Sequence, residues 1–381
     1  MSLQLNRRQW LKTSAVAAAG LIVSRNYTAC QSKDALPRFS ISGEEPIRLG
    51  NNESPYGISD GARQAIISSI DRSNRYPHGY YLQLKELIAE KENVSAENII
   101  LGAGSTDVMT SLIHVYGTQG SIMVGDPTYF DFVIYASRAC CPLQQVPLND
   151  NYEHDLPAME QRIDRDTRLI YICNPNNPTG SITPREKLRS FCERASDKAL
   201  VVVDEAYHEY VEDRAYASLV DLAREGRDIV VTRTFSKVFG LAGLRVGYGI
   251  ARSDIIKELE RMERNFAPVA WLSLRAAIAS YKDPQFPRTV KQKNREVKSY
   301  LYEELERLNL AYVPSHTNFV LFKVNQDSWK IAKDFERRNI LIRPFEFKRQ
   351  YWIRVSLGTR EEIQAFISVL TDFTLRRRYD E

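Results

Sequence analysis

A lysine stands in a stretch of small residues directly after an apolar run. Lys237 follows the apolar residues 228–232 and precedes a glycine-rich stretch at residues 240–247. A lysine in this place could form an imine with an aldehyde, provided that a cationic neighbour or desolvation lowers its pKa enough for the amine to be neutral. Arg245 would be such a neighbour if both side chains face one pocket. Because a single lysine is most often a solvated surface charge, other residues must support this interpretation.

A carboxylate ends a second apolar run. Asp204 follows Val201, Val202 and Val203 directly. A buried carboxylate costs free energy unless it has a partner. A protonated pyridine nitrogen is one such partner, because the resulting ion pair keeps the ring an electron sink. An arginine or a helix N-terminus is the other, and Asp204 alone does not decide between them.

Three turns carry polar or aromatic groups after further apolar runs. Residues 174–180 contain asparagine amides that could donate hydrogen bonds to a ligand oxygen. Gly104, Ser105 and Thr106 lie between a predicted strand and a predicted helix, where hydroxyls and exposed N–H groups form a natural phosphate site, although Ser and Thr also serve as ordinary N-caps. Tyr129 could stack on a flat ring or be an ordinary core tyrosine. Each turn taken singly therefore has an ordinary structural explanation as well as a functional one.

These residues lie on a pattern of alternating short apolar runs and helical segments. The apolar runs predict strands at residues 99–101, 121–124, 168–173, 200–203 and 228–232. Apolar spacing predicts helices at residues 61–69, 80–92 and 108–116. Short, almost wholly apolar strands that alternate with helices indicate an α/β fold whose mainly parallel sheet is covered on both faces. Such sheets bind ligands at the carboxyl ends of their strands, which is where the candidate residues stand.

The pattern changes near residue 280. A long charged helix is predicted at residues 292–308, and the segments 318–322, 352–356 and 361–370 suggest a smaller α+β unit. We therefore expect four parts. They are an export signal at 1–30, an arm belonging partly to the small domain at 31–58, a large domain at 59–278 and a small C-terminal domain at 279–381.

Composition narrows the function classes. The chain has 381 residues, 43% of them hydrophobic and 26% charged, which is ordinary for a globular protein. Its formal charge of +4 includes no Lys/Arg-rich stripe interleaved with aromatics, so nucleic acid is not an expected partner, whereas anionic small molecules are. None of the five cysteines shows CxxC spacing, so we expect neither a zinc site nor a redox pair, and disulfides stay open.

The N-terminus resembles an export signal. Arg7 and Arg8 precede a short apolar run at residues 13–23, as in a twin-arginine signal, and the run is too short for an ordinary membrane-spanning helix. Cys30 in Thr28-Ala29-Cys30 is a candidate lipid anchor. We expect a periplasmic or otherwise exported protein; the alternative is an uncleaved leader on a cytoplasmic one.

Together the motifs resemble fold-type I pyridoxal-phosphate (PLP) aminotransferases, and within them the histidinol-phosphate aminotransferase branch. The resemblance runs from about residue 49 to residue 370. Its most specific pieces are residues 174–180, 204–207, 236–237 with Arg245, and 352–359. It implies a large domain with a mainly parallel seven-stranded sheet and a smaller α+β domain.

The same resemblance implies a role for each site residue. Lys237 would hold PLP as a Schiff base and move protons, and Asp204 would pair with the pyridine nitrogen. The phenolic oxygen of the cofactor would be bound by Asn177 and Tyr207, and Tyr129 would stack on its ring. The cofactor phosphate would be held by Ser105, Thr106, Ser236 and Arg245, with Tyr76 reaching it from the other subunit of a homodimer. The substrate would be bound by Arg354, Arg343 and Asn52.

The implied reaction is a ping-pong transfer of an amino group from an amino acid or amino-phosphate donor to a 2-oxo acid. Decarboxylation, elimination and amino-acid oxidation by PLP enzymes share this scaffold and stay open. An exported PLP-fold binding protein without turnover is the alternative of another class. A nicotinamide-dependent dehydrogenase is disfavoured, because Asp107 occupies the place of the last glycine in a GxGxxG turn. Export is also hard to reconcile with a phosphorylated biosynthetic substrate, so the substrate stays open.

Overall fold

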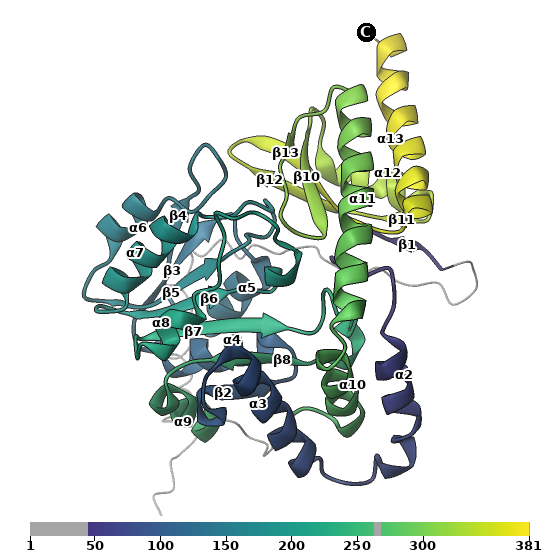
Figure 1. Ribbon diagram of the computed structural model, residues 1–381. Coiled ribbons are helices and arrows are strands. Elements are labelled where there is room, and N and C mark those ends of the chain that lie inside the picture. The colour runs from purple at the N-terminus through teal and green to yellow at the C-terminus, as the bar shows by residue number, and fades with distance from the viewer. Residues whose placement is uncertain (1–44, 263–267, 381) are drawn as a thin grey trace, which may run out of the picture. The chain divides into compact units, whose positions relative to one another are not determined.

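The computed structural model describes residues 45–262 and 268–380 (Figure 1). The predicted export signal at 1–30, with its paired arginines and Cys30, lies outside the described residues, as does the first half of the predicted arm, residues 31–44. No helix within the described ranges is long and apolar enough to cross a membrane. The four described cysteines, Cys140, Cys141, Cys173 and Cys192, are all free thiols.

A seven-stranded sheet carries the strands that the apolar runs predict. Its strand order is β2-β8-β7-β6-β5-β3-β4, and β8 pairs antiparallel with both β2 and β7, while the pairs from β7 to β4 are parallel. The strands are β2 (Ile99–Gly102), β3 (Ser121–Asp126), β4 (Leu143–Pro147), β5 (Thr167–Cys173), β6 (Leu200–Asp204), β7 (Ile229–Thr234) and β8 (Gly247–Ile250). The predicted mainly parallel sheet is confirmed.

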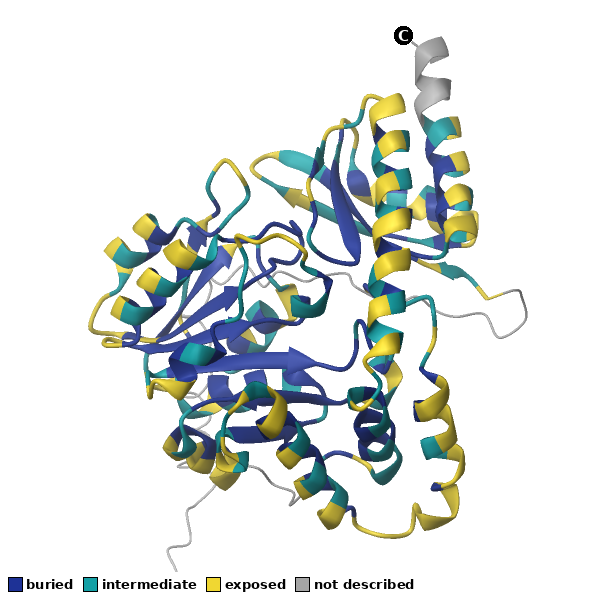
Figure 2. Cartoon of the chain, in the orientation of Figure 1, coloured by how far each residue is buried: buried dark blue, intermediate teal, exposed yellow. Residues whose placement is uncertain are grey.

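Alternate residues of these strands enter two separate hydrophobic cores. Ile170, Ile172, Val201 and Val203 point into one core, which also contains apolar residues of α3 (His78–Glu92), α6 (Leu156–Arg162), α7 (Arg185–Ala195), α8 (Val220–Arg224) and α10 (Trp271–Tyr281). Tyr171, Cys173, Val202 and Val230 point into the other, with α4 (Ser105–Val115), α5 (Phe130–Arg138) and α9 (Ser253–Met262). The central strands β5, β6 and β7 are therefore buried on both faces, as Figure 2 shows, which explains why most of their positions are apolar.

A four-stranded antiparallel sheet forms the C-terminal part. Its order is β12-β13-β10-β9, with β9 (Tyr312–Val313), β10 (Phe319–Val324), β12 (Arg343–Phe347) and β13 (Gln350–Ser356). The long helices α11 (Gln285–Arg307) and α13 (Arg360–Asp380) run side by side and pack with α12 (Ser328–Arg337) on this sheet (Figure 1). β1 (Ile47–Arg48) pairs in parallel with β11 (Ile340–Leu341), so the segment before α2 (Asp60–Ile67) is attached to the C-terminal part.

Several helices and strands extend beyond the boundaries predicted for them. The long helix begins at Gln285 instead of residue 292, because Asp283 Oδ1 accepts hydrogen bonds from the backbone N–H groups of Gln285 and Phe286 and so starts it within a polar stretch. The segment at residues 361–370 belongs to a helix, α13, which continues to Asp380. Strands β6 and β7 extend through polar Asp204 and Thr234. Apolar periodicity marks buried positions, so it misses polar residues at the ends of elements.

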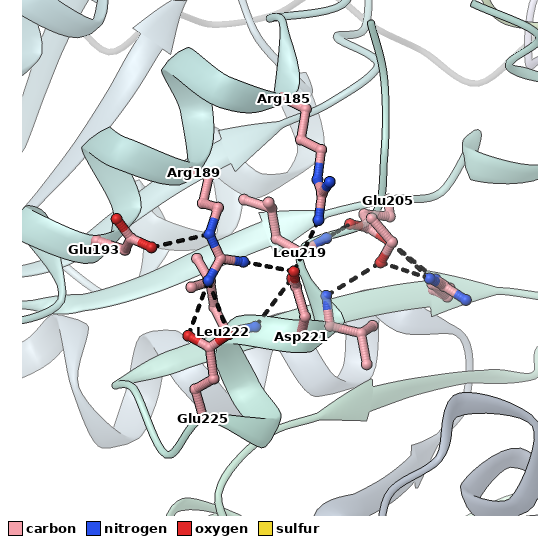
Figure 3. A network of polar contacts seen from close by, with 11 residues as sticks. Arg185, Arg189, Glu193, Glu205, Leu219, Asp221, Leu222 and Glu225 are labelled. Atoms are coloured by element: carbon pink, nitrogen blue, oxygen red, sulfur yellow. Dashed lines mark hydrogen bonds and ion pairs between the residues drawn. The ribbon is translucent and has the colours of Figure 1, made fainter. Parts of the chain in front are cut away.

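Two ionic networks join the elements that support β6 and β7 (Figure 3). On the outside, Arg189 of α7 pairs with Asp221 and Glu225 of the α8 region at 2.5 and 2.8 Å. In the interior, Glu205 accepts hydrogen bonds from the Leu219 backbone N–H at 2.8 Å and from the guanidinium of Arg233 at 2.9 Å. Glu205 and Arg233 directly follow Asp204 and Thr232, so this buried pair fixes the carboxyl ends of both strands.

Candidate active site

Asp204 lies at the carboxyl end of β6 and is only 2% exposed. Tyr171 Oη donates a hydrogen bond to its Oδ2 at 2.8 Å, and Thr232 Oγ1 donates one to its Oδ1 at 3.1 Å. Burial raises the pKa of this carboxyl group, while the two hydroxyls oppose that shift. The described residues give Asp204 no arginine partner in an ion pair, and the carboxylate stands at the ligand-binding edge of the sheet.

Lys237 follows β7 and lies near Asp204. Its Nζ is 5.7 Å from the centre of the Tyr207 ring and donates to the carbonyl oxygen of Asn51 at 3.4 Å. The pKa of its amine is lowered to about 8, first by desolvation and then by the positive charge of Arg354. Arg245, the cationic neighbour expected from the sequence, has the same effect but a smaller one.

Arg354 of β13 links the C-terminal sheet to the turn at residues 174–180. Its Nη1 donates to Asn177 Oδ1 at 2.6 Å, and its Nη2 donates to the carbonyl oxygen of Gly50 at 2.5 Å. The guanidinium is buried between the rings of Phe319 and Phe345, and its Nε has no hydrogen-bond partner among the described residues. A buried cation with an unused donor is a site for an anion.

A second arginine stands opposite the first. Arg343 of β12 is the register partner of Arg354 of β13, so both side chains leave the same face of the sheet. Burial and the charge of Arg343 together lower the pKa of Arg354 to about 10, against the opposing influence of Tyr207. Two guanidinium groups on one face favour a bound carboxylate or phosphate.

The residues predicted to hold the cofactor phosphate, Ser105, Thr106, Ser236 and Arg245, form a cradle at the start of α4. Gly104 has φ +87°, and a Cβ atom there would come within 2.4 Å of Arg245 Nη2, so the backbone and the guanidinium approach each other as only glycine allows. Arg245 Nη1 also donates to Ser236 Oγ at 3.4 Å. Ser105 and Thr106 are the first two residues of this helix, where unpaired N–H groups attract anions.

Two predicted tyrosines have different surroundings. Tyr129 is half-buried directly before α5; its hydroxyl donates to Asp131 Oδ2 at 3.0 Å and also contacts Thr106. Tyr76 is 83% exposed and stacks on His78 with ring centres 6.0 Å apart. The structure therefore brings Tyr129 to the site within one chain and leaves Tyr76 on the surface.

Asn52, predicted to bind the substrate, contacts Tyr207, which is predicted to bind the cofactor. Its Nδ2 donates to Tyr207 Oη at 2.9 Å. Ser356 Oγ donates to Asn52 Oδ1 at 3.1 Å, and Asn318 Nδ2 donates to the Asn52 carbonyl oxygen at 3.0 Å, which hold the residue in a left-handed conformation with φ 56°. The arm before α2 thus completes the surroundings of the Tyr207 hydroxyl.

Sequence reasoning missed Tyr171, Thr232, Ser356 and Asn318. One signal could have found the first two. Tyr171 is a polar-tipped residue in an apolar strand, and its parity places it on the same sheet face as Cys173, the register partner of Asp204. No comparable signal marks Ser356 or Asn318, because their partners are more than 260 residues away in the sequence.

Comparison with known proteins decides the family. A family model described as aminotransferase class I and II matches residues 44–370. The chain belongs to this family. It is 38% identical over 332 residues to a histidinol-phosphate aminotransferase of Moorella thermoacetica, with 86% of each chain covered. It is 35% identical to that of Halalkalibacterium halodurans, with 86% of this chain and 89% of the relative covered.

Comparison with solved structures supports the same family. The histidinol-phosphate aminotransferase of Sinorhizobium meliloti, solved in complex with pyridoxal-5'-phosphate, matches with a TM-score of 0.80 and 26% identity over 87% of this chain and 92% of that one. This chain is a PLP-dependent aminotransferase, which acts on small molecules. Its residues fit the cofactor: the glycine-framed cradle suits a phosphate, Asp204 suits a pyridinium, and Lys237 has an amine that can be neutral.

The lowered pKa of Lys237 predicts how fast the apoenzyme captures PLP. The neutral amine is the nucleophile. The rate of imine formation should therefore increase about tenfold for each unit by which the pH is raised toward 8, and it should level off above pH 8. Stopped-flow absorbance between pH 6 and pH 10 measures this. Lys298, whose pKa is also lowered to about 8, provides a control, since Lys298→Met should keep the profile. A rate that keeps rising to pH 10 would contradict the prediction.

Proposed function

We propose that this aminotransferase takes an amino group from a donor that carries a second, anionic group, an amino-phosphate of the histidinol-phosphate kind, and passes it to a 2-oxo acid. The observation that carries the proposal is the Arg354–Arg343 pair, in which a buried guanidinium with an unused Nε stands opposite a second arginine. An anion there offers the charge-assisted hydrogen bonds that arginine forks make best. The relatives named above support this donor class.

The cofactor side of the site follows from the contacts already described. PLP, when bound, supplies an aldehyde carbon and an electron-withdrawing ring. We propose that Ser105, Thr106, Ser236 and Arg245 hold its phosphate and that Asp204 faces its ring nitrogen. Asn177 and Tyr207 are then the donors for its phenolic oxygen, and Tyr129 packs on the ring.

The chain's own groups account for proton movement. Lys237 has an amine that is close to half neutral near pH 8, so it can accept a proton from the donor's α-carbon and would pass it to the carbon that the PLP aldehyde supplies. Arg354 and Arg343 bind the anionic end of the donor and then that of the 2-oxo acid, so one pair of arginines serves both halves of the reaction. Packing of Phe345 against Arg354 keeps water from part of the guanidinium and strengthens its hold on an anion.

The test is a comparison of histidinol phosphate with histidinol as donors, at fixed 2-oxoglutarate. Losing the phosphate removes charge-assisted contacts, so kcat/KM should fall about 30- to 1000-fold. Equal kcat/KM values would contradict the phosphate part of the proposal. Greater activity with an amino acid such as phenylalanine or aspartate would replace it by a donor carboxylate at the same arginines.

We also propose that the enzyme is a homodimer with shared sites. Large exposed apolar side chains come shortly before and after Tyr76 in the sequence; they are Ile67, Ile70 and Leu82. A surface of this kind is typical of a subunit interface. The partner subunit's Tyr76 would then complete the phosphate cradle.

Mixed dimers test this sharing. One parent carries Lys237→Ala and the other Tyr76→Ala, and each is expected to be weakly active. A mixed dimer regains one complete site, which has Lys237 from one chain and tyrosine from the other, so activity should return on mixing after dissociation. No recovery, or a monomer in sedimentation, would overturn the shared site.

A further inference from the structure

Three hydroxyl or carboxylate side chains on neighbouring strands meet on one face of the seven-stranded sheet. Asp204 of β6 is the register partner of Thr232 on β7 and of Cys173 on β5, and Tyr171 lies two residues before Cys173 on the same face. Both carboxylate oxygens of Asp204 are occupied, Oδ2 by Tyr171 and Oδ1 by Thr232. The three strands lie side by side in Figure 1.

The Tyr171 side chain is held rigidly for this contact. It is completely buried, and its ring stacks on Phe132 of α5 with centres 3.8 Å apart and an angle of 10° between the planes. A buried tyrosine hydroxyl needs a partner, and the structure gives it Asp204 Oδ2. Cys173 lies beside this contact: its thiol donates to the carbonyl oxygen of Pro175 at 3.3 Å and also meets the Tyr171 hydroxyl.

Several other groups act on Asp204 electrostatically. Lys237 stabilises its charge, as does a hydrogen bond from the backbone N–H of Ala206. Tyr129 and Tyr207 are neutral phenols whose ionisation the Asp204 charge opposes. Burial disfavours the charged carboxylate and raises its pKa. Among residues of the neighbouring strands, Tyr171 and Thr232 oppose this effect by donating hydrogen bonds to the carboxylate.

We propose that Tyr171, assisted by Thr232, is a positioning residue that holds negative charge on Asp204 and so keeps the proton of the Asp204–pyridine pair on the ring nitrogen. The proposal rests on the proposed role of Asp204 toward PLP. Hydrogen bonds to the carboxylate lower its affinity for a proton. Removing one donor moves the shared proton from nitrogen toward oxygen without changing the total charge of the pair, and an unprotonated ring withdraws electrons less well.

The test uses the holoenzyme reconstituted with ring-¹⁵N-labelled PLP. Wild type should show the ¹⁵N NMR signal of a protonated pyridine nitrogen, and Tyr171→Phe should shift it toward the unprotonated position. The same variant should lower kcat about tenfold while the donor KM stays within about twofold, because a charge-assisted hydrogen bond is lost at Asp204 and none at Arg354. A purely structural role would not move the nitrogen signal in this way.

Three variants complete the design. Tyr312→Phe removes another tyrosine–carboxylate hydrogen bond, the 2.8 Å contact with Glu306 in the C-terminal part, and should leave the signal and kcat unchanged. Thr232→Val should shift the signal in the same direction as Tyr171→Phe, and Thr232→Ser, which keeps the hydroxyl, should restore it. If Tyr171→Phe does not fold, the comparison of Thr232→Val with Thr232→Ser tests the proposal without it.

The outcomes separate this inference from the function beneath it. An unshifted nitrogen signal in both Tyr171→Phe and Thr232→Val overturns the inference while leaving the aminotransferase and the role of Asp204 intact. An unprotonated nitrogen in wild type, or wild-type protein that binds no PLP, instead overturns the proposed role of Asp204 itself.

Discussion

Replacing Lys237 with alanine is expected to lower kcat for transamination by a factor of about 10²–10⁴, because the reaction loses its positioned acid–base group. The residue stands after β7, near Tyr207 and the Asp204 carboxylate, and its amine is neutral enough near pH 8 to accept a proton. Alanine is smaller than lysine and creates no clash. Among the described residues, the substitution breaks no salt bridge and removes one hydrogen bond, from Nζ to the carbonyl oxygen of Asn51 at 3.4 Å. Folding should therefore be retained, and PLP should still bind through the phosphate cradle without forming the imine.

Single-turnover absorbance with a large excess of donor measures the loss. Lys298→Met is the matched control, since Lys298 also has a pKa near 8 but donates to the carbonyl oxygen of Ser315, which is not one of the proposed catalytic or binding residues. The control should keep at least half of the wild-type rate. Wild-type turnover in Lys237→Ala would show that another group moves the proton.

Arg354→Met is expected to lower kcat/KM for an anionic donor by about 10²–10³, mainly through KM. The guanidinium makes two hydrogen bonds within the chain, to Asn177 and Gly50, and its Nε has no partner among the described residues. Arg354→Lys should recover little, because an ammonium group cannot make both internal contacts and grip a planar carboxylate or a phosphate at the same time. Steady-state kinetics with histidinol phosphate and 2-oxoglutarate tests both variants.

A surface arginine of the same C-terminal part provides the control. Arg338 pairs with Asp372 at 3.1 Å, and Arg338→Met should change kcat/KM by less than about twofold, as expected for an exposed ion pair. If Arg354→Met left the donor KM unchanged, the anion would have to bind elsewhere and the proposed donor class would lose its support.

The sheet and most of the site residues were predictable because they depend on local signals. Strands β2, β3, β5, β6 and β7 are buried on both faces, so each is a continuous apolar run that sequence reasoning finds easily. Asp204, Lys237 and the turn at 174–180 directly follow such runs, and the geometry of parallel strands places their carboxyl ends at one edge.

The hydrogen bonds between site residues that are far apart in the sequence could not be predicted. Asn52 meets Tyr207 across 155 positions of sequence, and its left-handed backbone has no marker beyond the asparagine itself. Tyr171 resembled an ordinary core residue, since one hydroxyl in an apolar strand does not reveal its partner. The proposed role of Tyr76 cannot be seen in the structure of one chain, because it needs a second subunit.

The most direct test of the central claim is the visible absorption of the holoenzyme during a half-reaction. One equivalent of amino donor should remove the band of PLP bound to Lys237, and subsequent addition of a 2-oxo acid should restore it fully. This reversibility is what transamination requires, because the amino group rests on the cofactor between the two halves. A band that fails to return, or donor consumption that releases carbon dioxide or ammonia instead of a keto product, would contradict the account.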